Sequence, residues 1–143
     1  MRWTKLNTTF DAEPNAPRPR VFVVGGNVTV RFFLNPFVRS DVHEGDEGLL
    51  TFRGVLMYRL GPTNDEGFYR GQCRFSHSGI AWGDFYELHG SAWQETFPAD
   101  RVLVSTCLKD DPSLRHYLFY FRDETFECIA KGVQFHLCAR GEQ

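Results

Sequence analysis

The side chains most able to do chemistry in this sequence alternate with apolar residues along segments that have the pattern of β-strands. Glu87 and His89 are two positions apart, so they point to the same side of a strand. Arginine guanidinium groups bind carboxylates and phosphates through paired hydrogen bonds. The pattern therefore predicts one polar face that holds a polar or anionic ligand, and this face consists of Arg59, Arg70, Arg74, Glu87, His89, Tyr120 and Arg122.

The same alternation is also typical of a solvent-facing ladder of cross-strand ion pairs, because exposed faces of antiparallel sheets carry alternating polar residues. Charges that face into a barrel cannot stay unpaired, so they would instead mark a ligand cavity. The two interpretations differ in one structural fact, namely whether these side chains face a cavity or bulk water.

Glu87 and His89 also form a candidate acid–base pair, but no motif supplies a nucleophile. His77 lies between two serines, yet the Gly-x-Ser-x-Gly turn of serine hydrolases is absent, and the Ser-His-Ser-Gly run is more typical of a turn. Cys73 and Cys128 fall on expected apolar faces, where burial raises the pKa of a thiol. The sequence therefore favours a binding protein over an enzyme.

Metal and cofactor motifs receive little support. The acidic loop 41–47 has oxygen ligands for Ca²⁺, but it lacks the alternating ligands and closing glutamate of an EF-hand, and His43 is a poor Ca²⁺ ligand. The four cysteines have no Cys-x-x-Cys spacing. Gly25-Gly26 precedes a strand pattern and not a helix, so it is no phosphate loop. We expect no metal and no cofactor.

Composition limits the partners and the compartment. The formal net charge of the 143 residues is -2, which argues against a general nucleic-acid binder. The first residues lack the apolar core of a signal peptide, and no apolar run approaches the roughly 18 residues of a membrane span. We therefore expect a soluble, cytoplasmic protein with no membrane segment.

The elements that must position these side chains are marked by three Asp-Glu pairs, at 46–47, 65–66 and 123–124, each followed by an apolar run. Aspartate favours turns because its carboxylate accepts hydrogen bonds from nearby backbone N–H groups. Gly25-Gly26-Asn27 predicts a tight hairpin, and Gly54 predicts a bend in a long strand. The predicted strands cover 21–24, 28–34, 49–60, 68–75, 84–89, 102–107, 117–122, 125–130 and 133–137.

The last hairpin has the clearest pattern. A two-residue loop at Asp123-Glu124 would place Phe121 opposite Phe126. A slip of one residue would turn Glu127 toward the core, so the apolar pattern fixes the parity of the strands. The expected apolar face consists of Tyr117, Phe119, Phe121, Phe126, Cys128 and Ala130.

The fold predicted from these elements is all-β: an antiparallel up-and-down sheet of about eight or nine strands, curled into a barrel or sandwich, with at most short helical turns. Residues 1–20 form an arm that is proline-rich at its end, and the spacing of Trp3, Leu6 and Phe10 allows a short helix there. Residues 21–143 form a single β domain.

Three functions are compatible with this pattern. The first is a non-enzymatic binding protein for a small polar or anionic ligand, held mainly by Arg59, Arg70, Arg74, Glu87 and Tyr120. The second is a protein–protein module of the inhibitor or immunity type, whose acidic turns dock a basic protein partner. The third is a small acid–base enzyme that uses Glu87 and His89. An open edge strand would also allow a homodimer.

Overall fold

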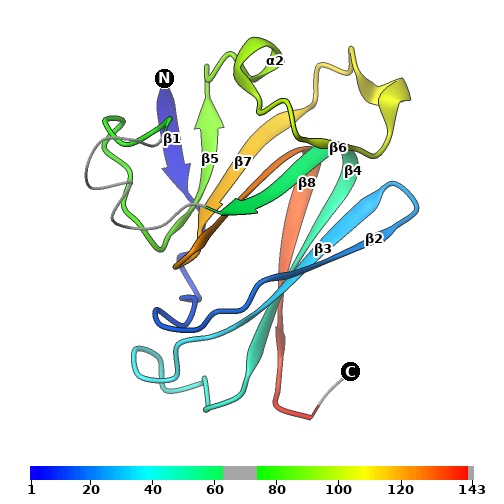
Figure 1. Cartoon of the computed structure of the whole chain (residues 1–143). Coiled ribbons are helices and arrows are strands. Elements are labelled where there is room, and N and C mark those ends of the chain that lie inside the picture. The colour runs from blue at the N-terminus through cyan, green and yellow to red at the C-terminus, as the bar shows by residue number, and fades with distance from the viewer. Residues whose placement is uncertain (63–73, 142–143) are drawn as a thin grey trace.

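The computed structural model describes residues 1–62 and 74–141, and this part of the chain forms one antiparallel sheet of eight strands (Figure 1). The short helices are α2 (Trp93–Thr96) and η1 (Thr106–Leu108). The strands are β1 (Arg2–Lys5), β2 (Arg20–Val24), β3 (Asn27–Phe33), β4 (Glu47–Pro62), β5 (Phe85–His89), β6 (Val102–Leu103), β7 (Arg115–Tyr120) and β8 (Glu124–Cys138). The prediction of an all-β antiparallel fold is confirmed.

The strand order is β1-β5-β7-β8-β4-β3-β2, and β6 pairs with β4 outside this path. The long strands β4 and β8 run side by side through the molecule, with Glu47 opposite Cys138 at one end and Pro62 opposite Glu124 at the other (Figure 1). β1 and β2 are the edges of the described sheet, which does not close into a barrel.

The two hairpins that the sequence marks most clearly both form. β2 and β3 meet at a tight turn in which Val24 pairs with Asn27 and Gly25 has a φ of +59°, the left-handed region that glycine adopts without strain. In the last hairpin Tyr120 pairs with Thr125, so the turn is Arg122-Asp123 and not the predicted Asp123-Glu124.

This displaced turn changes the partner of each residue but not the face it occupies. Phe119 lies opposite Phe126, whereas the sequence placed Phe121 there. The register therefore differs by two residues, which preserves the alternation of the strands. Every residue of the expected apolar face belongs to the main core: Tyr117, Phe119, Phe121, Phe126, Cys128 and Ala130.

β4 bends at Gly54, as predicted, where φ is +60° and the register with β8 shifts between Val55 and Met57. Because the bulge disturbs the alternation, Val55 joins the main core, and Leu56 and Met57 pack in a separate cluster. Val55 therefore lies on the same face as Leu50 and Phe52, although simple alternation would place it on the other face.

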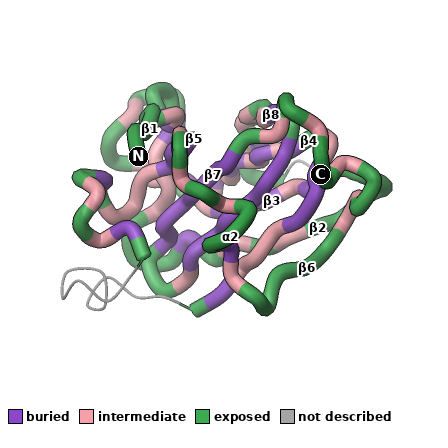
Figure 2. The backbone as a smooth tube through the Cα atoms, turned by 90° about the horizontal axis from the view of Figure 1, so that it is seen from above, coloured by how far each residue is buried: buried purple, intermediate pink, exposed green. Residues whose placement is uncertain are grey.

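The main core lies on one side of the sheet, which we call the core face. Aromatic rings from distant strands meet there: Phe32 of β3 is 5.3 Å from Phe119 of β7, and Phe10 of the arm stacks on Phe135 of β8 at 4.0 Å. Figure 2 shows buried positions gathered along the central strands, whereas β2 and β6 are largely exposed. These contacts between rings of distant strands add to the stability that burial supplies.

The opposite side of the sheet, which we call the outer face, is covered in part by connecting segments. Phe75 and Ile80 pack on Tyr86, Leu118 and Tyr120. A second cluster joins Leu56 and Met57 of β4 to Phe97 beyond α2 and Ile129 of β8. Polar residues on this face of β7 and β8 are consequently buried, although an exposed antiparallel face would have left them in water.

The N-terminal segment is a strand and an arm, not a helix. β1 pairs with β5, with Trp3 opposite Leu88. The arm then connects β5 to β3 through backbone hydrogen bonds from Leu6 N–H to Phe85 and from Glu13 N–H to Phe33. The expected helix was wrong because strand pairing with β5 outweighs the weak helical spacing.

Two further expectations need correction or lie beyond the described residues. Only Val102–Leu103 of the predicted strand 102–107 is a strand, because the chain enters η1 at Thr106. Most of the predicted strand 68–75 falls within 63–73, outside the described residues, and residues 74–79 are turns. None of the described helices has the length and apolarity needed to cross a lipid bilayer.

Candidate active site

The polar residues that the sequence assigned to one face occupy two faces. Phe85 belongs to the main core, so Glu87, two positions further along β5, lies on the core face, and so does His89. Arg59 pairs across strands with Glu127, between core residues Phe126 and Cys128, so it lies on the outer face. The prediction that these residues share one face is therefore wrong, because alternation sets the side of each residue within a strand, whereas the pairing register sets how the sides of different strands align.

The outer-face residues have separate surroundings. Arg59 Nε donates to Asp100 Oδ1 at 2.7 Å, and this hydrogen bond holds the pKa of Asp100 below its ordinary value. Arg74 pairs with Glu127 at 2.6 Å. Arg70 lies outside the described residues.

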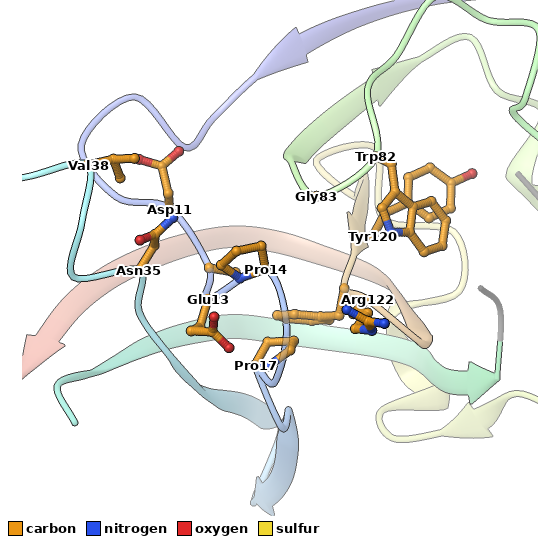
Figure 3. A pocket seen from close by; sticks show the side chains of 12 residues that line it. Asp11, Glu13, Pro14, Pro17, Asn35, Val38, Trp82, Gly83, Tyr120 and Arg122 are labelled. Atoms are coloured by element: carbon orange, nitrogen blue, oxygen red, sulfur yellow. The ribbon is translucent and has the colours of Figure 1, made fainter. Parts of the chain in front are cut away.

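Tyr120 and Arg122 line a cavity of about 250 Å³ between the last hairpin turn and the arm (Figure 3). The Trp82 ring stacks on Tyr120 with centroids 4.6 Å apart. Arg122 Nη1 donates to Asn15 Oδ1 at 3.2 Å. Figure 3 shows Asp11 and the prolines of the arm on the opposite side of this cavity, so these two predicted residues face a cavity that the other predicted residues do not share.

A chain of hydrogen-bonded polar side chains extends from Arg74 into the buried part of the outer face. Arg74 Nη1 donates to both carboxylate oxygens of Glu127, at 2.9 and 2.6 Å. Glu127 Oε1 lies 3.0 Å from His116 Nε2. The other ring nitrogen, Nδ1, lies 2.7 Å from the hydroxyl oxygen of Ser91. These contacts form an unbroken Ser91–His116–Glu127–Arg74 relay.

Neighbouring strands bring the relay together. His116 of β7 lies opposite Leu88 of β5 on one side and Ile129 of β8 on the other. Glu127 of β8 lies opposite Leu118, so it is on the same face as His116 and one diagonal step away. Diagonal neighbours on adjacent strands are within reach of long side chains, which explains the 3.0 Å contact.

Ser91 reaches His116 because the chain turns sharply at the end of β5. Gly90 and Ala92, the residues on each side of Ser91, have φ values of 70° and 53°. A left-handed alanine is strained, and such residues cluster at functional sites. The Thr96 hydroxyl donates to the Ser91 and Ala92 carbonyl oxygens at 3.2 and 3.0 Å, so α2 holds the turn in place.

A neutral His116 beside an ionised Glu127 gives the relay a defined order of hydrogen bonds. The Arg74 guanidinium stabilises the Glu127 carboxylate, which then accepts a hydrogen bond from Nε2–H of His116. In this neutral tautomer Nδ1 has a lone pair and accepts a hydrogen bond from the Ser91 hydroxyl. This is the hydrogen-bond order of a serine, histidine and carboxylate triad, with the two ring nitrogens exchanged.

The histidine is enclosed while the serine is partly accessible. The His116 side chain is 0% exposed, and the rings of Phe75 and Phe97 each lie 5.9 Å from it. Ser91 is of intermediate exposure and lines a cavity of about 290 Å³ that also includes His116. Solvent or a substrate can therefore meet the relay at Ser91.

The predicted Glu87–His89 pair lines the same cavity. Glu87 Oε2 lies 3.4 Å from His89 Nδ1, and Arg115 Nη1 lies 3.3 Å from Glu87 Oε1. Tyr117 lies opposite Glu87 on the adjacent strand β7. Burial and the Glu87 charge raise the pKa of Tyr117 to about 12, so its phenol stays protonated. The acid–base pair that the sequence indicated is thus close in space and borders a cavity.

Sequence reasoning missed Ser91 and His116, and it treated Glu127 only as a polar-face residue. One signal was present: His116 shares its strand face with Leu118 and Tyr120, while Tyr117 and Phe119 occupy the other face. A strand that is apolar on both faces is buried on both, and a histidine within it needs polar partners.

Other candidate groups have structural roles. In the acidic loop, Asp46 accepts hydrogen bonds from the backbone N–H groups of His43 and Arg140, and these bonds hold its pKa below the ordinary value. Burial raises the pKa of the Cys128 thiol well above its ordinary value, so it is a poor nucleophile. Across residues 1–62 and 74–141, no group of three or more His, Cys, Asp or Glu side chains could hold a metal ion.

Comparison of the chain with protein-family models, with curated proteins and with solved structures finds no match. No family is therefore assigned. Ser91, His116 and Glu127 are joined by hydrogen-bond contacts, and Ser91 lines a cavity beside them.

Proposed function

We propose that this protein is a small hydrolase of the acyl-transfer type in which Ser91 is the nucleophile. The observation that carries the proposal is the 2.7 Å contact between Ser91 Oγ and His116 Nδ1, with Glu127 3.0 Å from the opposite ring nitrogen. A serine hydroxyl becomes nucleophilic when an adjacent base takes its proton and a third group orients that base. The relay contains all three groups.

In the first half of the reaction, Ser91 Oγ attacks the carbonyl carbon of an ester, and its proton moves to His116 Nδ1. The resulting tetrahedral intermediate expels the alcohol, which takes the proton from Nδ1 as the carbon–oxygen bond breaks. Glu127 stabilises the imidazolium that exists between these proton transfers. In this proposal Arg115, which lines the cavity, stabilises the negative charge of the intermediate.

In the second half, water enters the cavity and gives a proton to His116 Nδ1 while its oxygen attacks the acyl-enzyme carbonyl carbon. Collapse of this intermediate breaks the bond to Ser91 Oγ, which regains the proton and releases a carboxylic acid. The burial of His116 supports this cycle, because the attraction between imidazolium and carboxylate is stronger where water is excluded.

The experiment combines turnover with covalent labelling. We expect the purified protein to hydrolyse 4-nitrophenyl acetate and to react with a fluorophosphonate at Ser91, located by peptide mass spectrometry. Ser91→Ala should abolish both signals, whereas Ser113→Ala, a change at an exposed serine, should retain both. Circular dichroism melting of each variant separates loss of chemistry from loss of folding. The proposal fails if the folded wild-type protein is not labelled at Ser91.

A second candidate function follows from Tyr120 and Arg122, which line the cavity of Figure 3 together with Trp82. An arginine beside stacked aromatic rings suits a small polar or anionic ligand, the function that the sequence favoured first. Native mass spectrometry of protein purified from its host should then show a retained small molecule that Arg122→Ala loses. Detection of unliganded protein alone would contradict this candidate. Docking of a basic protein by the acidic turns stays a prediction, for which pull-down from the host is the test.

A further inference from the structure

We infer that the substrate of Ser91 carries a medium-length apolar acyl group that ends in an anionic group. This inference rests on the proposed hydrolase function. A second cavity, of about 460 Å³, lies beside the Ser91 cavity, and Trp93 and Gln94 line both. Trp93 and Gln94 are the first two residues of α2 and follow the turn that contains Ser91. The two cavities are therefore parts of one continuous surface.

The second cavity has an apolar lining. Leu56 and Met57 come from the bulged part of β4, Leu103 from β6 and Trp93 from α2. The same β4 residues pack against Phe97 and Ile129, so the base of the cavity belongs to a buried cluster. Its volume lies in the range of small-molecule sites, roughly 300–1,000 Å³, and such sites bind the apolar parts of ligands. An alkyl chain gains favourable free energy for each methylene group that it buries there.

The rim of this cavity carries positive charge. Arg101 and Lys109 line it, together with the single carboxylate of Asp110. Within the described chain, the Lys109 ammonium has no ion-pair partner, and the Arg101 guanidinium donates only to the carbonyl oxygen of Pro98, at 3.3 Å. The rim therefore has two cations and one anion, and a terminal carboxylate on the ligand would balance the remaining positive charge.

Continuity with the nucleophile distinguishes a substrate site from an unrelated groove. A chain whose carboxylate lies at Lys109 and whose methylenes lie on Leu56 and Met57 passes Trp93 toward Ser91. An acyl group bound in this way places its ester carbonyl at the mouth of the relay. Binding energy from the remote apolar part would then orient the reacting carbon.

The test compares three 4-nitrophenyl esters: acetate, octanoate and the monoester of suberic acid. We expect kcat/KM to rise from acetate to octanoate and again to the suberate monoester. Lys109→Ala should lower the rate with the suberate monoester about tenfold, the usual effect of losing one charge-assisted hydrogen bond, and leave octanoate unchanged. The matched control, Lys131→Ala, removes a lysine that pairs with Asp111 outside the cavity and should retain the preference for the anionic ester.

A binding measurement that does not depend on turnover accompanies the kinetics. Suberate should quench tryptophan fluorescence on titration, and Trp93→Phe should remove the signal, because this ring borders both cavities. Turnover through Ser91 with equal kcat/KM for the three esters overturns the inference and leaves the proposed function intact. Absence of Ser91 labelling overturns the proposed function, whereas suberate binding that requires Lys109 would still establish the anionic, apolar site.

Discussion

The hydroxyl oxygen of Ser91 lies 2.7 Å from Nδ1 of His116, although the two residues are 25 positions apart in the chain. β5 and β7 are neighbours in the sheet, and the turn after β5 folds back over the first residues of β7. The contact thus depends on strand order and on the left-handed backbone at Gly90 and Ala92. Neither the strand order nor the backbone conformation of this turn can be recognised from a local sequence motif.

Glu127 should act by positioning His116. Glu127→Gln keeps the shape of the side chain but offers an amide N–H as well as an oxygen, so it no longer fixes the proton on Nε2 of His116. We expect kcat for the ester to fall by about 10³–10⁴ with little change in KM, as for the loss of an orienting carboxylate in other triads. Steady-state kinetics measure this, with Glu124→Gln in the same strand as control. A kcat within a few fold of the wild-type value would show that Glu127 has no such role.

The aromatic core should dominate stability. The Phe119 side chain is 0% exposed and stacks on Phe121 at 4.0 Å. Phe119→Ala should lower the free energy of unfolding by about 3–5 kcal/mol, because it removes buried apolar area and leaves a cavity. The control Phe37→Ala changes a residue that is 91% exposed and should cost less than about 0.5 kcal/mol. Urea denaturation gives both values; equal losses would contradict the assignment of the core.

Acid should loosen the segment before β7. The Ser113 hydroxyl and backbone N–H, together with Lys131, hold the pKa of Asp111 at about 2, below its ordinary value of 3.8. Because the folded-state pKa is the lower one, Asp111 contributes stability above about pH 4, and this contribution is lost as the pH falls from 3.8 toward 2. Thermal melts from pH 5 to pH 2 should show a smaller decrease in Tm for Asp111→Asn than for wild type. Parallel decreases for the two proteins would refute the role of Asp111.

The edge-strand homodimer expected from the sequence stays a prediction, and β2 is where it can be tested. Val23 and Val24 are 47% and 76% exposed on an edge of the described sheet. If a second copy pairs with this edge, light scattering should give a dimer for the wild type and a monomer for Val23→Lys, because lysine on an edge strand opposes pairing. The control Val38→Lys, at an exposed site outside the strands, should stay dimeric. A monomeric wild-type protein would exclude this dimer.

Local patterns predicted a large part of the fold. The alternation around Phe119 and Phe126 correctly predicted which side chains enter the core. The turn is displaced by one residue, which shifts the register by two residues and so leaves each side chain on its predicted face. The bend of β4 at Gly54 was also predicted, because glycine adopts the left-handed backbone conformation there without strain. The inverted side-chain directions just after Gly54 were not predictable, because a bulge has no distinctive apolar pattern.

The candidate site was predicted only in part. Glu87 and His89 were identified as an acid–base pair, since residues two apart on one strand share a side, and they line the cavity with Ser91. Arg59, Arg74 and Tyr120 were grouped with them, but they lie on the other face of the sheet or beside a different cavity. Parity within each strand was correct except at the bulge of β4, but the phase between strands was unknown.

The sequence by itself determined an all-β antiparallel chain, its main hairpins and the residues of its aromatic core, because the period of apolar residues is a local property of the strand. Only the tertiary structure decided that connecting segments cover the outer face, that Phe75 and Phe97 pack against His116, and that Glu127 is buried. The reason is physical: burial and hydrogen-bond geometry depend on which distant strands become neighbours. Ser91 contacts His116 only because β5 and β7 are neighbours in the folded sheet.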